Sequence, residues 1–509
     1  MTSRRTVLGL LAGAAAGIVG VPLLSGLRGS SSTGVLLNSR RALPAPFTQA
    51  WQAPPVLAPS RSTVDTDYFE LVQRPAMVEL LPGVPTPIWG YDGRFPGPTI
   101  VATRGRRAVV THRNELPVPT VVHLHGGRTA AEHDGFPTDL LYPVGFRGPM
   151  TGHDMGGTVT HGARDYVYST EQAGATLWYH DHRMDFTGPA VWRGLAGFHL
   201  VHDRAEDALG LPSGERDLPI MITDRAFNSD GSLSYPSRDP SLLGVPGVEE
   251  PYTGGVLGDV ILVNGVPWPH ARIPAGRHRL RLLNASNARR YRLRLDPGLA
   301  LVQIGADAGL LHRPVVHDAL EIAPGERFDV VVDFGVVPAG QHIVLRNEFG
   351  DSGTDQVMRF EVLEAGPDPS RVPDVLGPDP DPAPAAVTRS FVFGNQRRSG
   401  MSGWTINGAS FDPDVAVATA TLGTTERWQL TSDLHHPVHL HLGSFTVIGR
   451  GINGPGPYDL GPKDTIDLRP AEQAEILVRF DGFEGRYVLH CHNLEHEDMA
   501  MMVRFDTTR

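Results

Sequence analysis

The chain has 509 residues, of which 40% are hydrophobic, with 58 Gly, 44 Pro and a single Cys. This composition is typical of a folded, turn-rich protein that is long enough for several hydrophobic cores, and roughly three domains are expected. The net charge of −11 argues against a nucleic-acid-binding protein, which would carry a basic patch, and one cysteine excludes an intrachain disulfide.

Residues 1–30 are typical of an export signal. Arg4 and Arg5 precede the apolar run 7–24, and the adjacent arginines resemble a twin-arginine signal. We therefore expect export to the periplasm, the cell wall or the exterior, and no membrane span in the mature protein. An uncleaved anchor helix is the alternative, which the glycines and Pro22 disfavour.

The rest of the chain reads as short strands separated by Gly, Pro, Asn and Asp. RFDVVVDF (327–334) and EILVRF (475–480) show the alternation of half-buried strands, which indicates an all-β protein built of sandwiches or barrels. Two strand units recur three times, about 150 residues apart. We predict three consecutive β-sandwich domains, with a Pro/Asp-rich linker before the third: 50–205, 215–365, linker 366–386, and 387–509.

The three copies of these units differ in their histidines. The outer copies contain four His-x-His pairs, and the middle copy has none: His123 with His125, His180 with His182, His439 with His441, and His490 with His492. Residues i and i+2 of a strand share a face, so each pair presents two imidazoles together. Random placement of 22 histidines would give about one such pair. The pattern predicts one multi-metal site between the first and third domains, with the second as a spacer.

The single thiol, Cys491, lies between two of these histidines and on a strand would face away from both. A thiolate with two imidazoles and a weak axial Met is the blue-copper arrangement, which is tuned for electron transfer. His436 and His496 would supply the imidazoles, and Met501 the axial ligand. Cys491 would then be both a ligand and a covalent bridge between two metal sites, whereas the alternative is an inert buried thiol.

The motifs HLHGG, WYHDH, HPVHLH and HCHNLEHEDMAM resemble the four copper motifs of the multicopper oxidases, such as laccases, bilirubin oxidases and phenoxazinone synthase. The resemblance covers about residues 50–509, and ILVNGVPWPHARI is most similar to the spore-coat laccase and bilirubin oxidase branch. It implies that the domains are cupredoxin-like Greek-key sandwiches and that the chain binds four copper ions.

The resemblance also implies which residue binds which copper. It assigns His436, Cys491, His496 and axial Met501 to the type 1 copper, His123 and His439 to the type 2 copper, and His125, His180, His182, His441, His490 and His492 to the type 3 pair. Met499, expected on the same strand face as Met501, is an alternative axial ligand.

The activity that the resemblance implies is one-electron oxidation of phenols or aromatic amines, with bilirubin as a further candidate. Electrons would enter near the surface through His496 or His436, and dioxygen would be reduced to water at the trinuclear cluster. Glu497 and Asp134 match acidic positions that would supply protons, although exposed or loop-capping carboxylates are the alternative. Asp181 would either orient an imidazole or be solvated.

The expected partners are a small aromatic reducing substrate and dioxygen, and we expect a monomer. An enzyme of copper tolerance that oxidises Cu(I) is the main alternative, since methionines cluster at 499–502. A non-enzymatic cupredoxin-fold scaffold would lack the ligands, and a simple blue electron carrier would not need eight further histidines. The remaining histidines, such as His133, His153, His161 and His435, are interpreted as structural or surface residues.

Overall fold

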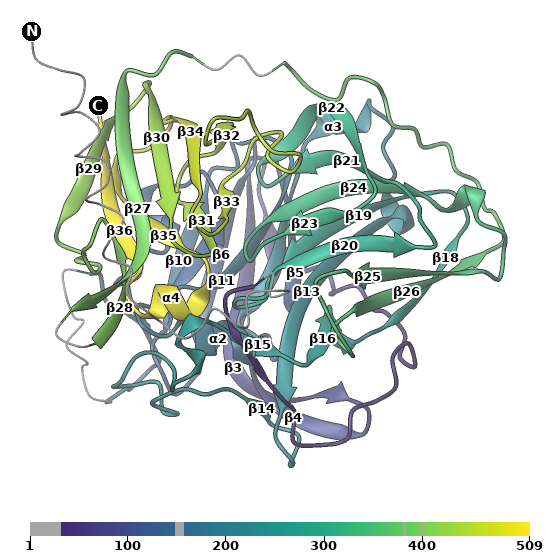
Figure 1. The fold of residues 1–509 in the computed structure, drawn as a ribbon, viewed down its shortest axis with the longest axis horizontal. Helices are drawn as coiled ribbons and strands as arrows, with labels where there is room; N and C mark the ends of the chain where they lie inside the picture. The colour runs from purple at the N-terminus through teal and green to yellow at the C-terminus, as the bar shows by residue number, and fades with distance from the viewer. Residues whose placement is uncertain (1–31, 148–156, 380–382, 399–400) are drawn as a thin grey trace, which may run out of the picture. The chain divides into compact units, whose positions relative to one another are not determined.

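The structure is a computed structural model that describes residues 32–147, 157–379, 383–398 and 401–509. The expected export signal and His153 therefore lie outside the described residues. Strands make up 49% of the structure and helices 6%, which confirms the all-β prediction. The six larger sheets form three pairs along the chain, as expected for three sandwiches, although the domain boundaries stay a prediction (Figure 1).

The N-terminal pair of sheets contains the first two histidine motifs. One sheet has five strands: β2 (Arg61–Ser62), β3 (Thr66–Leu81), β4 (Val84–Tyr91), β6 (Arg107–Asn114) and β10 (Ala163–Tyr168). The other has four, in the order β5 (Gly97–Thr103), β12 (Ala196–His202), β11 (Ala175–Asp181) and β7 (Val122–His125). Strands β7 and β11 are buried along their whole length, which places their histidines away from solvent.

The middle pair of sheets encloses a core of branched aliphatic and aromatic side chains. Its larger sheet contains β13 (Asp217–Phe227), β14 (Leu233–Ser234), β16 (Val260–Val263), β17 (Val266–Pro267), β19 (Arg277–Asn284), β21 (Leu301–Ala306), β22 (Gly309–His317) and β24 (Arg327–Asp333). The smaller sheet contains β18 (His270–Pro274), β20 (Tyr291–Asp296), β23 (Leu320–Ile322), β25 (His342–Asn347) and β26 (Gln356–Leu363). Burial alternates along β20 and β25, as the sequence pattern predicts for half-buried strands.

The C-terminal pair of sheets contains the thiol and the last two histidine motifs. One sheet has the order β28 (Met401–Ile406), β27 (Val387–Arg398), β30 (Thr425–Ser432), β34 (Gln473–Arg479) and β32 (Phe445–Arg450). The other has the order β29 (Ala416–Thr421), β36 (Met502–Thr508), β35 (Gly485–Cys491), β31 (His436–Leu440) and β33 (Thr465–Leu468). Cys491 is the last residue of β35, and its side chain belongs to the core of this pair.

Short helices and two small sheets complete the described part of the chain. The helices are α1 (Ala131–Asp134), α2 (Thr187–Arg193), α3 (Arg204–Asp207), α4 (Leu494–Asp498), and the 3-10 turns η1 (Gly214–Arg216), η2 (Tyr252–Gly254) and η3 (Phe334–Val336). The small sheets pair β1 (Val35–Leu37) with β15 (Val256–Gly258), and β8 (Leu141–Tyr142) with β9 (Thr160–His161). Helices α2 and α4 contact each other (Figure 1), because the Asp498 carboxylate accepts the backbone N–H groups of Thr187 and Gly188.

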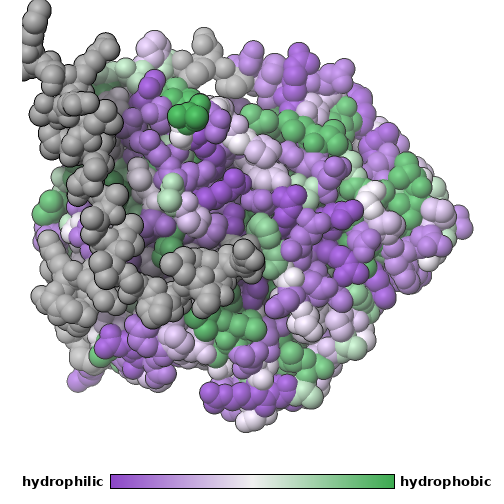
Figure 2. Space-filling model, in the orientation of Figure 1, coloured by the Kyte–Doolittle hydropathy of each residue, from purple (hydrophilic) through white to green (hydrophobic). Residues whose placement is uncertain are grey.

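The surface is mainly polar on the face that Figure 2 shows, and its hydrophobic residues form small separate patches. Among the described residues, we find no helix with the length and apolar character that crossing a membrane requires. Strands β7, β11 and β31 are buried along their whole length, and β35 is buried from Tyr487 to Cys491.

Candidate metal centres

Strand register brings the eight paired histidines into one cluster. His123 lies opposite His180 in the β7–β11 pair, and His439 lies opposite His490 in the β31–β35 pair. The two strand pairs also meet each other, because Nε2 of His123 is 3.3 Å from Nε2 of His439. All eight imidazoles are at most 1% exposed. The first and third sheet pairs therefore form a shared site, as the spacing of the motifs predicted.

The imidazoles of this cluster turn lone pairs toward one another. His123 Nδ1–H donates to the Asp134 carbonyl at 2.6 Å, and His439 Nδ1–H donates to the Asp464 carbonyl at 2.9 Å. A carbonyl only accepts, so the proton of each neutral ring is on Nδ1 and both Nε2 atoms carry lone pairs. These Nε2 atoms, 3.3 Å apart, would repel each other unless a cation lies between them. The cluster therefore fits metal ions.

Other members of the cluster have free ring nitrogens or close Nε2 contacts. His441 Nε2 and His182 Nε2 lie 3.2 and 3.3 Å from His490 Nε2. Nε2 of His180 and both nitrogens of His492 are buried without a hydrogen-bond partner among the described residues. Burial, with the neighbouring imidazoles, lowers the pKa of His441 and His492 well below the ordinary value. These rings are therefore neutral, which is the form that binds metals.

Two buried carboxylates contact the cluster, so the exposed interpretation of Glu497 and Asp134 is wrong. Glu497, on α4, has one oxygen 3.4 Å from His182 Nδ1 and the other 3.1 Å from His490 Nδ1. Asp134, the last residue of α1, has an oxygen 2.7 Å from His441 Nδ1. Burial raises the pKa of Asp134 well above its ordinary value. Burial would also raise the pKa of Glu497, but the adjacent imidazoles outweigh it and the pKa is lowered.

A second group of donors surrounds the thiol. Sγ of Cys491 is 3.4 Å from Nδ1 of His436 and 3.6 Å from Nδ1 of His496. The other nitrogen of each ring, Nε2, is held by a hydrogen-bond partner. His436 Nε2 is 2.8 Å from the Asp433 carboxylate, and His496 Nε2–H donates to the Gly254 carbonyl at 3.2 Å. Burial raises the pKa of the Cys491 thiol well above its ordinary value, so a soft cation is needed to stabilise the thiolate.

Met499 and Met501 lie between helix α4 and strand β36, which corrects the strand expected for these methionines. His496 lies on α4, Met499 caps that helix, and β36 begins only at Met502. Met499 and Met501 therefore do not share a strand face. Met501 is fully buried, and its carbonyl accepts the N–H of Cys491 at 3.1 Å.

The candidate type 1 histidines lie beneath the surface, because the Asp433 side chain that contacts His436 is 41% exposed. His436 and His496 are both fully buried. The indole of Trp404 stacks on the His496 ring at 3.6 Å, and its Nε1–H donates to the carbonyl of Thr253 in η2 at 3.0 Å. Trp404 and η2 thus cover the imidazole, which sequence spacing could not show.

Asp181 has neither of the expected roles. It is buried rather than solvated, and its side chain accepts the backbone N–H of Val121 at 2.9 Å rather than orienting an imidazole. Burial raises its pKa to about 7. The Asp181 side chain therefore holds the residue that directly precedes strand β7. His180 Nδ1–H donates instead to the backbone carbonyl of Asp181, at 2.8 Å.

The middle sheets contribute charges that the sequence did not reveal. Arg327 of β24 binds Asp464 at 2.7 Å, and the same carboxylate lies 3.2 Å from Nε2 of His125. The neighbouring Lys463 is fully buried and pairs with Asp307 at 3.1 Å and Glu326 at 3.0 Å. The middle region is therefore more than a spacer, and no motif around these residues signals the pairing.

The fold and the two donor groups define a copper-dependent oxidoreductase with oxygen as acceptor, and comparisons with known proteins agree. Two multicopper oxidase family models match residues 74–145 and 381–509. A laccase from Bacillus subtilis (strain 168) is 36% identical, and the match covers 91% of this chain and 98% of the laccase. A bilirubin oxidase from Albifimbria verrucaria is also 36% identical, and the match covers 91% of this chain and 81% of the bilirubin oxidase. The solved structure of a laccase from Pediococcus acidilactici has a TM-score of 0.80 at 28% identity, covering 93% of this chain and 96% of that chain. The chain belongs to the multicopper oxidase family.

Proposed function

We propose that this protein is a laccase-type oxidase, which oxidises phenols or aromatic amines one electron at a time and reduces dioxygen to water. One observation carries the proposal. The thiol of Cys491, with two imidazoles beside it, is joined directly through the chain to His490 and His492 of the eight-histidine cluster. A site for one-electron chemistry is thus covalently connected to a site that fits several ions.

The donor sets support four copper ions per chain. His436, Cys491 and His496, with Met501 axial, would hold the type 1 copper; His123 and His439 the type 2 copper; and His125, His180, His182, His441, His490 and His492 the type 3 pair. Bound copper would supply reversible one-electron oxidation at the thiolate and dioxygen reduction at the histidine cluster.

The chain's own residues orient these ligands and handle protons. The Asp134 and Asp464 carbonyls hold His123 and His439 in one tautomer, so each Nε2 lone pair faces the cluster interior. Glu497 reaches one imidazole from each outer sheet pair, so its carboxylate is placed to pass protons into the cluster. Asp134 is placed similarly beside His441.

Oxidation of Cu(I) remains the alternative activity, because Met499 lies half-buried at the end of α4, beside the thiol centre. The two activities can be separated by one experiment on the purified, copper-loaded protein. Its visible spectrum is recorded, and dioxygen uptake is then followed with 2,6-dimethoxyphenol or with Cu(I). A blue protein that consumes dioxygen with the phenol supports the proposal, whereas uptake with Cu(I) alone overturns it in favour of metal oxidation.

We also propose that the protein is exported as a monomer by residues 1–30, on the basis of the twin-arginine-like start and apolar run. Replacement of Arg4 and Arg5 by lysine should keep the protein in the cytoplasm of its host. Cell fractionation and light scattering would test the location and the monomeric state.

A further inference from the structure

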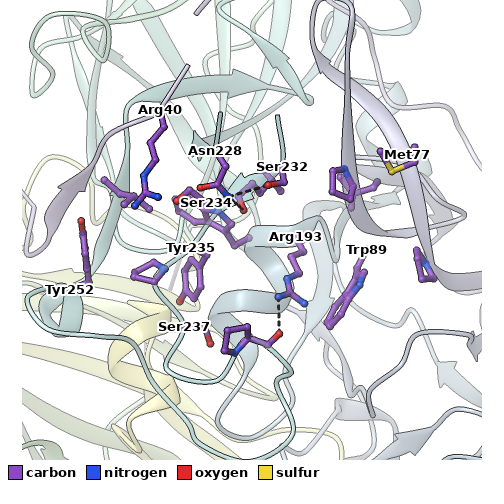
Figure 3. A pocket seen from close by; sticks show the side chains of 18 of the residues that line it. Arg40, Met77, Trp89, Arg193, Asn228, Ser232, Ser234, Tyr235, Ser237 and Tyr252 are labelled. Carbon is purple, nitrogen blue, oxygen red and sulfur yellow. Dashed lines mark hydrogen bonds between the residues drawn. The ribbon is translucent and has the colours of Figure 1, made fainter. Parts of the chain in front are cut away.

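A cavity of about 800 Å³ opens between strands β3 and β4, helix α2 and the segment 228–252 (Figure 3). We call it the Arg193 cavity. Its walls combine aromatic rings with aliphatic and proline side chains, and the aromatic residues are Trp89, Trp192, Tyr235 and Tyr252. Such a lining suits a flat aromatic ligand.

Two arginines give this cavity a positive character. Arg193 is half-buried, stacks over the Trp89 ring at 4.2 Å and donates to the Pro240 carbonyl at 3.3 Å. Arg40 lies on the opposite side of Tyr235 in the view of Figure 3. Among the described residues, no carboxylate lies at ion-pair distance from Arg193, whereas Arg40 and the acidic residue of the lining, Glu249, are both exposed. A partly buried cation without a counterion favours an anionic ligand.

The cavity wall leads to the thiol centre by two short routes. The Tyr235 hydroxyl donates to the buried carboxylate of Glu495 at 2.8 Å, and Glu495 directly precedes His496. Tyr252 begins η2, the turn whose Gly254 carbonyl accepts His496 Nε2–H. Trp404 and η2 cover His496 itself. The walls of the Arg193 cavity instead contact Glu495 and include the first residue of η2, so this cavity is a suitable place for a reducing substrate.

We propose that the Arg193 cavity binds phenolic carboxylates as substrates of this enzyme, an inference that rests on the proposed laccase-type function. Arg193 binds the carboxylate, and Trp89 and Tyr235 contact the ring. Each phenol loses one electron to the enzyme and its hydroxyl proton to solvent, leaving a phenoxyl radical. Four such oxidations supply the four electrons that one dioxygen and four protons need to form two waters.

Binding is tested first with a ligand that cannot be oxidised. Copper-loaded protein is titrated calorimetrically with 4-methoxycinnamate and with its uncharged methyl ester. The acid should bind about tenfold more tightly than the ester, a preference that Arg193→Gln should abolish because a charge-assisted hydrogen bond is lost. Arg313→Gln, which removes an exposed arginine outside the lining, should retain the preference. Equal binding of acid and ester by the parent, or an unchanged preference in Arg193→Gln, overturns the proposal.

Kinetics then separate this inference from the proposed function. Arg193→Gln should raise KM for ferulate about tenfold, leave kcat unchanged and leave KM for 2,6-dimethoxyphenol unchanged. Tyr235→Phe, which keeps the ring and removes the contact with Glu495, should lower kcat for ferulate more than for 2,6-dimethoxyphenol while retaining blue absorption. Equal effects on both substrates overturn the link through Tyr235. If no phenol is oxidised, the proposed function fails, and the calorimetry still decides whether the cavity binds the anion.

Discussion

Asp464→Asn should weaken copper binding by the histidine cluster, because Asp464 connects the middle sheets to two of its imidazoles. Its carboxylate lies 3.2 Å from His125 Nε2 and binds Arg327, and its carbonyl holds His439. Burial would raise the pKa of Asp464, but the charge of Arg327 outweighs it and lowers the pKa below the ordinary value. The carboxylate is therefore charged when it contacts the imidazole.

The expected size of the effect has two parts. Loss of a partner that orients a metal ligand typically weakens metal affinity by about 10–100-fold, or about 1.4–2.8 kcal/mol. Breaking the buried pair with Arg327 also destabilises the fold by about 3–5 kcal/mol. With an unfolding entropy of about 2.1 cal/mol/K per residue, a cooperative unit of this size would lose about 3–5 °C in Tm.

A matched control separates these two parts. Asp329 is also buried and pairs with an arginine, Arg279, but it contacts no histidine of the cluster. Asp329→Asn should lower Tm by a similar amount and leave copper affinity unchanged. Chelator competition, total copper per chain and the blue absorption would be measured for both variants. If Asp464→Asn loses only Tm, as Asp329→Asn does, Asp464 acts on stability alone and the reasoning is refuted.

Three further predictions follow from buried groups. Glu497→Gln should keep the blue absorption but slow dioxygen reduction, and unchanged turnover would remove Glu497 from the proton path. Burial lowers the pKa of His112 to about 3, so the unfolded chain binds a proton below about pH 6.5 that the folded chain does not. Stability should therefore fall by about 1.4 kcal/mol per pH unit between pH 6.5 and pH 4, and His112→Gln should flatten this part of the Tm–pH curve relative to the parent. Lys463→Met leaves Glu326 buried without its cation and leaves Asp307 with Arg327 alone, 3.7 Å away. The variant should cost about 3–5 kcal/mol in urea unfolding, part of which the added Glu326→Gln should restore; an unaffected midpoint would contradict this.

The sequence alone determined the strands and the pairing of the histidines. A strand has a side-chain period of two, so His-x-His spacing fixes two imidazoles on one face through local geometry. The recurrence of these pairs in the outer repeats, and their absence from the middle one, predicted the shared site between the first and third sheet pairs. The position of Cys491 between two histidines likewise required only the chain's own connectivity.

The tertiary structure decided which distant groups surround these ligands. Arg327 reaches Asp464 across 137 positions of sequence, and Trp404 covers His496, although neither pairing leaves a periodic signal. The strand expected across Met499 and Met501 begins only at Met502, because helix α4 precedes it. The carboxylates of α4 pack against other elements: Glu495 accepts from Tyr235 and Asn287, and Asp498 from helix α2. Local spacing fixes the ligands, whereas their burial, protonation and access depend on contacts that form only when the three sheet pairs pack together.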